Sequence, residues 1–346
     1  MSLQDQDDPP KAAGFMIPIA LPSVEALLFL AFLLATTFVW AVWTLGLLIR
    51  YAAGRWTRPM VVPYGLVTAV ALFTLWQIGD FYIQMHAYEK ERAASYRPEL
   101  AEPTRLGQID MPKGTKLELS VADTPESFRR ALFPHPVSVA DIDAVEIARY
   151  ISIKTNENYE TIGFTPDNMR ITGQGVTTQS GWRCDAKQPV EFDLKPDGGI
   201  SAFSTCILAD GNVVDGISLP KGTSLRSSTG NVYTDGFVDS DKWVLDTPEG
   251  QIVHIDDFDL EDVTLALDGE RNLYEIRRAR LSEEKMVGTE RSPPGTEIRL
   301  NSRHIRDDYP GAWWVMQPAD DTQSGPGSRQ SIVLSRHGDV LATLSE

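Results

Sequence analysis

The sequence is poor in the residues that most often build reactive centres. It contains only two cysteines and five histidines among 346 residues. Cys184 and Cys206 match no zinc-binding or CxxC redox spacing, and no histidine stands within a few positions of either. This scarcity argues against a structural zinc site and a dithiol redox centre. We therefore predict no metal site and no cofactor.

Familiar catalytic signatures are missing as well. The chain has no Walker loop, no HExxH, no GxSxG and no dinucleotide fingerprint after a strand. His254 stands beside Asp256 and Asp257, which would suit a metal or acid–base site. A histidine on a strand next to solvated carboxylates is the commoner case, and we favour it. No catalytic residue is predicted, and an enzyme of unrecognised class is the alternative reading.

Basic residues are outnumbered. The chain has 48 acidic and 32 basic residues, which gives a formal net charge of −16. Residues 87–346 alone carry 43 acidic and 28 basic side chains, a net charge near −15. Such a surface repels nucleic acid, so a nucleic-acid partner is not expected. A basic protein partner remains compatible with it.

Two long apolar runs stand out near the start of the chain. Residues 26–49 and 59–79 contain no charged residue. Each run is long enough to cross a hydrocarbon layer of about 30 Å as a helix. We predict two transmembrane helices that act as a plain anchor. Small residues spaced by four, such as Gly65 and Ala69, would allow two copies to associate through these helices.

The connector between the runs carries Arg50, Arg55 and Arg58 and no acidic residue. Short loops rich in arginine and lysine stay in the cytoplasm, and the flanks of this pair are acidic. The pattern predicts a multi-pass protein of the bacterial inner membrane with both termini in the periplasm. The three arginines would determine this topology.

We expect five segments. These are a periplasmic tail at 1–24, a transmembrane hairpin at 25–80 with its cytoplasmic turn at 50–58, a stalk at 81–106, a mixed α/β segment at 107–180, and a β-hairpin-repeat domain at 181–346. Helices are predicted at 124–132 and 138–151 from a capping signal and a helical apolar spacing. The fold class is thus an α+β membrane protein whose outer part is helical first and rich in β-hairpins afterwards.

The hairpins are indicated by repeated turn signals. Four runs show strand, glycine-containing turn and strand, with their turns at Gly198, Gly250, Gly269 and Gly338. A second element, Pro-x-Gly-Thr followed by alternating apolar residues, begins at positions 112, 220 and 293. The spacings of 108 and 73 residues are too irregular for a strict solenoid.

Residues 182–346 resemble the tandem hairpin repeats of bacterial MORN-like and antitoxin-repeat proteins. The resemblance is carried by the four glycine turns above together with Pro220, Gly222, Thr223, Pro293, Gly295 and Thr296. It implies a scaffold for protein or membrane contact and brings no catalytic residue with it.

Three groups of residues are candidates for a specific role. Cys184 and Cys206 are expected to form a disulfide, with two buried thiols as the alternative. Between 239 and 270, eleven acidic residues face one lysine. A Ca²⁺ site would lack the glycine of an EF-hand turn, and a dock for a basic partner would use Asp256, Asp257 and Asp259 as contacts. We favour internal pairing instead: a tight hairpin with Asp268 and Gly269 at its centre would place Asp259 opposite Arg278 and Asp257 opposite Arg280.

The third group is aromatic. Tyr309, Trp313 and Trp314 lie close together, and adjacent tryptophans on a strand point to opposite faces. One of them therefore needs cover from a loop, another copy or a partner. Taken together, the sequence favours a membrane-anchored periplasmic module that binds a protein, either as an immunity or inhibitor protein or as an accessory part of an envelope complex.

Overall fold

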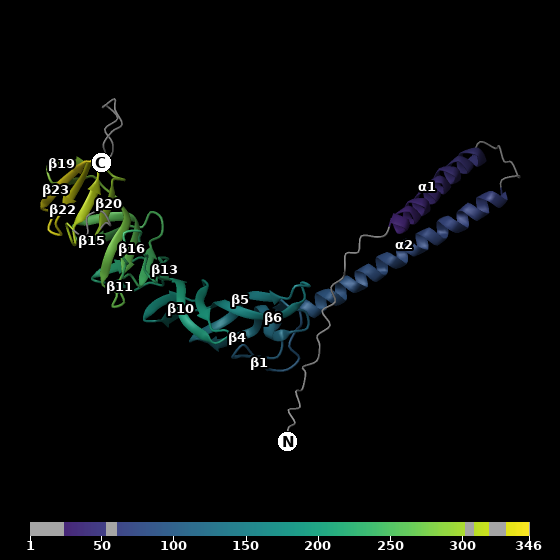
Figure 1. Ribbon diagram of the computed structural model, residues 1–346, viewed down its shortest axis with the longest axis horizontal. Coiled ribbons are helices and arrows are strands. Elements are labelled where there is room, and N and C mark those ends of the chain that lie inside the picture. The colour runs from purple at the N-terminus through teal and green to yellow at the C-terminus, as the bar shows by residue number, and fades with distance from the viewer. Residues whose placement is uncertain (1–23, 53–60, 302–307, 318–329, 346) are drawn as a thin grey trace, which may run out of the picture. The chain divides into compact units, whose positions relative to one another are not determined.

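The computed structural model describes residues 24–52, 61–301, 308–317 and 330–345 (Figure 1). The chain divides into two compact units. The first contains Met1–Arg97 and Lys154–Gly163, and the second contains Pro98–Ile153 and Phe164–Glu346.

The first unit holds two helices, α1 (Val24–Ala52) and α2 (Val61–Tyr96). They pack against each other, and the indole Nε1 of Trp40 donates a hydrogen bond to Thr68 Oγ1 at 3.0 Å. Ala71 and Thr74 of α2 are buried. Helix α2 runs without a break into the segment predicted as a stalk and ends at Tyr96.

No helix in the described part of the chain combines the length and the apolar character needed to span a membrane. The predicted transmembrane hairpin, the integral membrane partnership and the multi-pass inner-membrane location with periplasmic termini are therefore wrong. The prediction rested on the absence of charged residues from the two runs, but α2 extends beyond its run and carries charged residues from Asp80 onwards.

The arginine connector loses its predicted role together with the membrane. Arg50 is exposed in the last turn of α1. Arg55 and Arg58 lie outside the described residues. Association of two copies through membrane-embedded helices is likewise no longer supported.

The second unit is built from antiparallel strands. Its strands, in chain order, are β1 (Thr104–Leu106), β2 (Ile109–Met111), β3 (Lys116–Leu119), β4 (Phe128–Val139), β5 (Ile142–Thr155), β6 (Thr161–Gln174), β7 (Val176–Gln179), β8 (Trp182–Asp185), β9 (Val190–Leu194), β10 (Ile200–Ile207), β11 (Asn212–Val214), β12 (Ile217–Leu219), β13 (Ser224–Ser227), β14 (Trp243–Asp246), β15 (Val253–Ile255), β16 (Phe258–Leu267), β17 (Leu273–Leu281), β18 (Lys285–Val287), β19 (Glu290–Ser292), β20 (Glu297–Leu300), β21 (Trp313–Met316), β22 (Gln330–Leu334) and β23 (Val340–Ser345).

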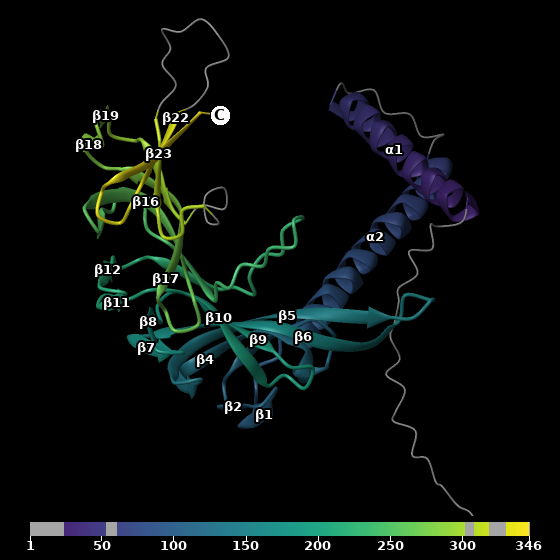
Figure 2. The same ribbon diagram turned by 60° about the vertical axis from the view of Figure 1, so that its left-hand side comes forward.

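One long sheet joins most of these strands in the order β3-β4-β5-β6-β9-β10-β13-β14-β16-β17-β20-β21-β22-β23, with β15 paired to β16. The remaining strands form the short hairpins β1–β2, β7–β8, β11–β12 and β18–β19. In Figure 2, β7–β8, β11–β12 and β18–β19 lie beside the long sheet. Strands that are neighbours in the long sheet are thus also close to each other in the sequence.

The predicted helices at 124–132 and 138–151 are wrong. The first segment contains only a short 3-10 turn (Pro125–Ser127) and then enters β4, and the second lies in the β4–β5 hairpin. Ala140 and Asp141 form its turn with φ of 52° and 59°, a left-handed conformation that a helix does not allow. Apolar side chains at 144 and 147 are buried on a strand here, because a register shift in the β4–β5 pairing changes the simple period of two.

The three Pro-x-Gly-Thr turns form the same hydrogen bonds. Each threonine Oγ1 donates to the carbonyl of its own proline, at 2.7, 2.8 and 2.6 Å in chain order. Each glycine N–H donates to a leucine carbonyl, and that leucine N–H donates back to the threonine carbonyl. The leucines are Leu100, Leu208 and Leu281. The sequence repeat is therefore a structural repeat.

Three of the four glycine turns connect paired strands, namely β9–β10, β16–β17 and β22–β23. The turn at Gly250 does not, because β14 and β15 both pair with β16. The β16–β17 register also differs from a two-residue turn at 268–269. Leu267 faces Leu273 across a longer loop, and bulges bring Glu261 opposite Arg280.

Candidate functional site

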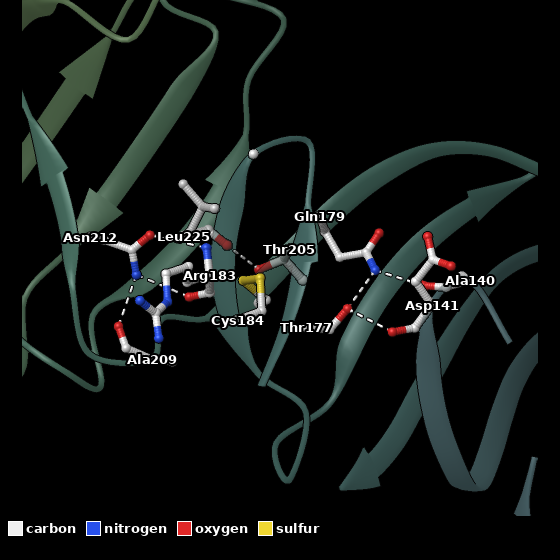
Figure 3. The surroundings of a disulfide bond; sticks show 12 residues. Ala140, Asp141, Thr177, Gln179, Arg183, Cys184, Thr205, Ala209, Asn212 and Leu225 are labelled. Atoms are coloured by element: carbon white, nitrogen blue, oxygen red, sulfur yellow. Dashed lines mark hydrogen bonds between the residues drawn. A yellow bond between two sulfur atoms is a disulfide. The ribbon is translucent and has the colours of Figure 1, made fainter. Parts of the chain in front are cut away.

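The predicted disulfide is present. Cys184 on β8 and Cys206 on β10 are bonded, with their Cα atoms 5.9 Å apart (Figure 3). The bond joins a short hairpin to the long sheet. Gln179 on the same hairpin donates from Nε2 to the carbonyl of Ala140 at 2.6 Å, and Asn212 of β11 donates to the carbonyl of Arg183 at 3.0 Å (Figure 3). These contacts fix the hairpins and leave no reactive thiol.

The predicted aromatic surface is covered by the chain itself. Trp313 is fully buried against Phe258, with ring centroids 4.9 Å apart, and Trp314 is only 3% exposed. Trp314 packs with Ala312 and Val333, and the half-buried Tyr309 packs against this cluster. The two tryptophans do face opposite sides of the strand. Neither is available as an exposed anchor for a partner.

The three predicted acidic residues make contacts within the chain, Asp256 and Asp259 through their carboxylates and Asp257 through its backbone carbonyl. Asp256 accepts a hydrogen bond from Trp313 Nε1 at 3.1 Å and forms an ion pair with Arg336 at 2.8 Å. Asp259 lies 2.9 Å from Nδ1 of the exposed His254. The carbonyl of Asp257 accepts a hydrogen bond from Lys285. No group of three His, Cys, Asp or Glu residues suited to a metal ion occurs among the described residues.

The acidic run instead supplies two buried carboxylates to a different place. Asp239 and Asp241 lie between β13 and β14, are 5% and 3% exposed, and face Arg277 of β17. Arg277 Nη2 lies 3.1 Å from Asp241 Oδ1 and 3.6 Å from Asp239 Oδ2, and its Nε donates to Glu275 at 3.2 Å. We call Asp239, Asp241, Glu275 and Arg277 the Arg277 cluster.

The Arg277 cluster has more negative than positive charge. Three carboxylates share one guanidinium, and the side chain of Asp241 is fully buried. Neither of its oxygens has a hydrogen-bond donor among the described residues, so the ion pair with Arg277 is its main compensation. Buried carboxylates usually accept several hydrogen bonds. The cluster is thus short of positive charge and of donors.

Its titration behaviour follows from burial. Burial raises the pKa of Glu275 above its ordinary value, and the nearby Arg277 offsets only part of this effect. Burial works to lower the pKa of Arg277, but the carboxylates, Asp241 first, outweigh it and raise that pKa. Burial and a hydrogen bond to Asp239 raise the pKa of Tyr233, whose hydroxyl donates at 2.8 Å.

A cavity of about 320 Å³ opens beside the cluster. Its polar wall includes Asp239, Asp268 and Glu275, and Tyr274 adds an aromatic ring. The remaining lining residues are Leu273, Asn301, Pro310 and Gly311. Carboxylates beside an aromatic ring suit an organic cation, which gains both ion pairing and cation–π attraction.

Sequence reasoning found the acidic run but missed Arg277, Glu275 and Tyr274 as its partners. The available signal was the spacing of Glu275 and Arg277, two residues apart on one strand. The register itself could not be read from the sequence, because the β16–β17 pairing contains bulges. No family model matches the sequence, and comparison with curated proteins and with solved structures finds no match.

Proposed function

We propose that this protein is a binding module for a basic protein segment, and that the cavity beside the Arg277 cluster receives one lysine or arginine side chain. The observation that carries the proposal is the wall of Asp239, Asp268 and Glu275 next to Tyr274. The formal net charge of −16 favours approach of a basic partner. The aromatic residues near 313 play no part in it.

The geometry suits a side chain better than a bare metal ion. The wall combines carboxylates with an aromatic ring, whereas a hard cation such as Ca²⁺ is held by six to eight oxygens in a closed shell. A long basic side chain can place its charge near Glu275 while its methylene groups contact Leu273 and Pro310. A guanidinium would also find paired carboxylate oxygens.

Titration of the full-length protein with small probes tests this proposal. N-acetyl-arginine amide and N-acetyl-lysine amide should shift the amide NMR signals of Tyr274 and Glu275 in a saturable way, whereas the neutral N-acetyl-norleucine amide should not. The shifts should weaken as salt is raised. Equal binding of the neutral probe, or no saturable shift with either cation, contradicts the proposal.

A matched pair of variants separates the cavity from the overall negative charge. Glu275→Gln should weaken binding of the arginine probe by about tenfold, the loss expected for one charge-assisted hydrogen bond. Glu249→Gln removes the same charge at an exposed position of the acidic run that does not line the cavity, and should leave affinity nearly unchanged. Equal loss in both variants would point to diffuse charge attraction.

A further inference from the structure

A buried arginine lies elsewhere in the second unit without an acidic partner. Arg149 of β5 is 6% exposed. Its Nε donates to the carbonyl of Phe128 at 3.0 Å and its Nη2 to the carbonyl of Glu126 at 2.6 Å, while its guanidinium carbon lies 3.5 Å from the centroid of the Phe128 ring. No carboxylate forms an ion pair with it among the described residues. A buried charge usually has such a partner.

The guanidinium remains cationic under ordinary conditions. Burial lowers the pKa of Arg149 to about 10, which is still well above neutral pH. Among the described residues, two backbone carbonyls and the face of an aromatic ring stabilise its positive charge. The site therefore holds a positive charge that no described carboxylate neutralises.

The third nitrogen of Arg149 lies under two tight turns. A Cβ added to Gly107, in the β1–β2 turn, would lie 2.6 Å from Nη1, and one added to Gly198, in the β9–β10 turn, would lie 3.8 Å from it. The same Cβ on Gly198 would lie 3.4 Å from the Gly107 Cα. The two turns thus meet over the guanidinium, and glycine is what allows this approach.

These turns form one side of a cavity of about 310 Å³. Apolar side chains supply much of the rest of its wall, and they are Ile109, Val139, Ala140, Met169 and Ile200. Asp110 also borders the cavity, but its side chain is 85% exposed and lies 3.7 Å from Arg105. The wall is therefore apolar on one side, with a buried positive charge behind the glycine turns.

We propose that this cavity binds a small amphiphilic anion, an organic carboxylate whose head lies over the turns at Gly107 and Gly198 and whose apolar body contacts Met169. The carboxylate head would be attracted by the positive charge of Arg149. The glycines allow this close approach, because a side chain at 107 or 198 would keep the head farther from the guanidinium. The body would bury apolar surface, which favours binding. The site is separate from the Arg277 cluster and independent of its function.

Octanoate is the probe for this site. Titrating it into the full-length protein should produce saturable amide NMR shifts at Gly107, Gln108, Gly198 and Gly199. Octanol, which has the same tail without the charge, should bind about tenfold more weakly, because it lacks the charge-assisted interaction. Octylammonium should not bind. Equal affinity for octanoate and octanol, preference for octylammonium, or no localised shift would each overturn the proposal.

Two variants test the location of the anion site and leave Arg149 in place, because its loss would also break two backbone hydrogen bonds. Ile200→Trp places a larger ring at the cavity edge, where Ile200 is 38% exposed, and should abolish octanoate binding while thermal unfolding stays unchanged. Arg170→Met removes an exposed arginine that pairs with Glu191 and should bind octanoate like the unmodified protein. Undiminished binding by a folded Ile200→Trp protein would place the anion elsewhere.

Discussion

Two arginines, the half-buried Arg277 and the buried Arg149, show how differently a guanidinium can be compensated. Arg277 is surrounded by three carboxylates, and Arg149 by two carbonyls and a ring. Removing the first would leave negative charge without a partner, whereas removing the second would leave carbonyls without donors. The energetic consequence is larger in the first case, because an unpaired buried charge costs more than an unpaired dipole.

Arg277→Met should therefore destabilise the protein by about 3 kcal/mol, since its loss leaves the buried Asp239 and Asp241 and the half-buried Glu275 without a cation. Urea unfolding measures this loss. Adding Asp241→Asn should recover part of it, because one buried charge is removed. The exposed neighbour Arg278→Met is the control and should change stability by less than about 0.5 kcal/mol. Equal effects in both single variants would show that the cluster does not depend on Arg277.

Glu275 should give the protein a distinct pH dependence. Its pKa is raised above the ordinary value of 4.5, so the folded state binds its proton more tightly than the unfolded state. Stability from this group is fully present below pH 4.5 and is lost as pH rises through the higher folded pKa. Relative to Glu275→Gln, the unmodified protein should lose stability across that interval. A constant difference between the two unfolding curves from pH 4 to pH 8 would show that burial does not perturb this carboxyl.

At the scale of elements, turns and strands were more predictable than helices. Pro-x-Gly-Thr and the glycine turns at 198, 250 and 338 marked real turns because proline and positive-φ glycine act locally. The spacing of Ala144 and Ile147 suggested a helix because a strand with a register shift can imitate a helical period. Bulges are set by packing between strands, so the β16–β17 register could not be derived from the turn residues alone.

The candidate site was less predictable still. Asp239 and Asp241 were identified as part of an acidic run, but their closest cation lies more than thirty residues away along the chain. The burial of Trp313 and Trp314 depends on contacts with Phe258 and Val333 from other strands. Local sequence does not encode such pairings.

The Pro-x-Gly-Thr turn itself makes a testable contribution. Thr223→Val keeps the shape of the fully buried threonine but removes its hydrogen bond to the Pro220 carbonyl, which should cost about 1 kcal/mol in thermal or chemical unfolding. Thr115→Val and Thr296→Val should cost similar amounts because their bonds are the same. Thr178→Val, on the exposed face of β7, is the control. A neutral Thr223→Val would show that the backbone bonds alone hold the turn.

The disulfide joins two elements, β8 and β10, and closes a sequence separation of 22 residues. Replacing both Cys184 and Cys206 by alanine should reduce the free energy of unfolding by about 3 kcal/mol, the chain-entropy value for a loop of this size. Urea unfolding of the oxidised protein and of the double variant provides the comparison. The loss of unfolding free energy in the double variant should match the loss that a reductant causes in the unmodified protein. If both losses are negligible, the unfolded chain is already constrained between residues 184 and 206 without the disulfide.

At the scale of the second unit, the sheet has two unlike ends. Beside β3, Leu117 N–H donates to the carbonyl of Pro98, so the preceding chain covers that edge. On the outer side of β23 no strand is paired among the described residues. The stability of a strand in such an array comes mainly from its two neighbouring strands, and a strand at the end of the sheet has only one neighbour.

Hydrogen exchange should reveal this difference. Amides of β23 should exchange at least about tenfold faster than those of β14 and β16, because β23 can open without breaking the rest of the sheet. Amides of β3 should fall between them. Mass spectrometry of peptides after timed labelling gives the rates. Uniform protection from β3 to β23 would mean that the sheet opens only as a whole.

The repeated turn also bears on how such a chain could have arisen. Each of its three copies pairs with a leucine of its own in the same way, although 108 and then 73 residues separate the copies. Duplication or loss of a hairpin between two copies would leave each turn intact, so descent by tandem duplication need not preserve length. The sequence similarity between duplicated copies would then be limited to the few residues of the turn and its leucine, which is too little for an alignment of whole chains to detect. Related arrays of this kind are then better recognised by the shared hydrogen bonds of their turns than by overall sequence identity.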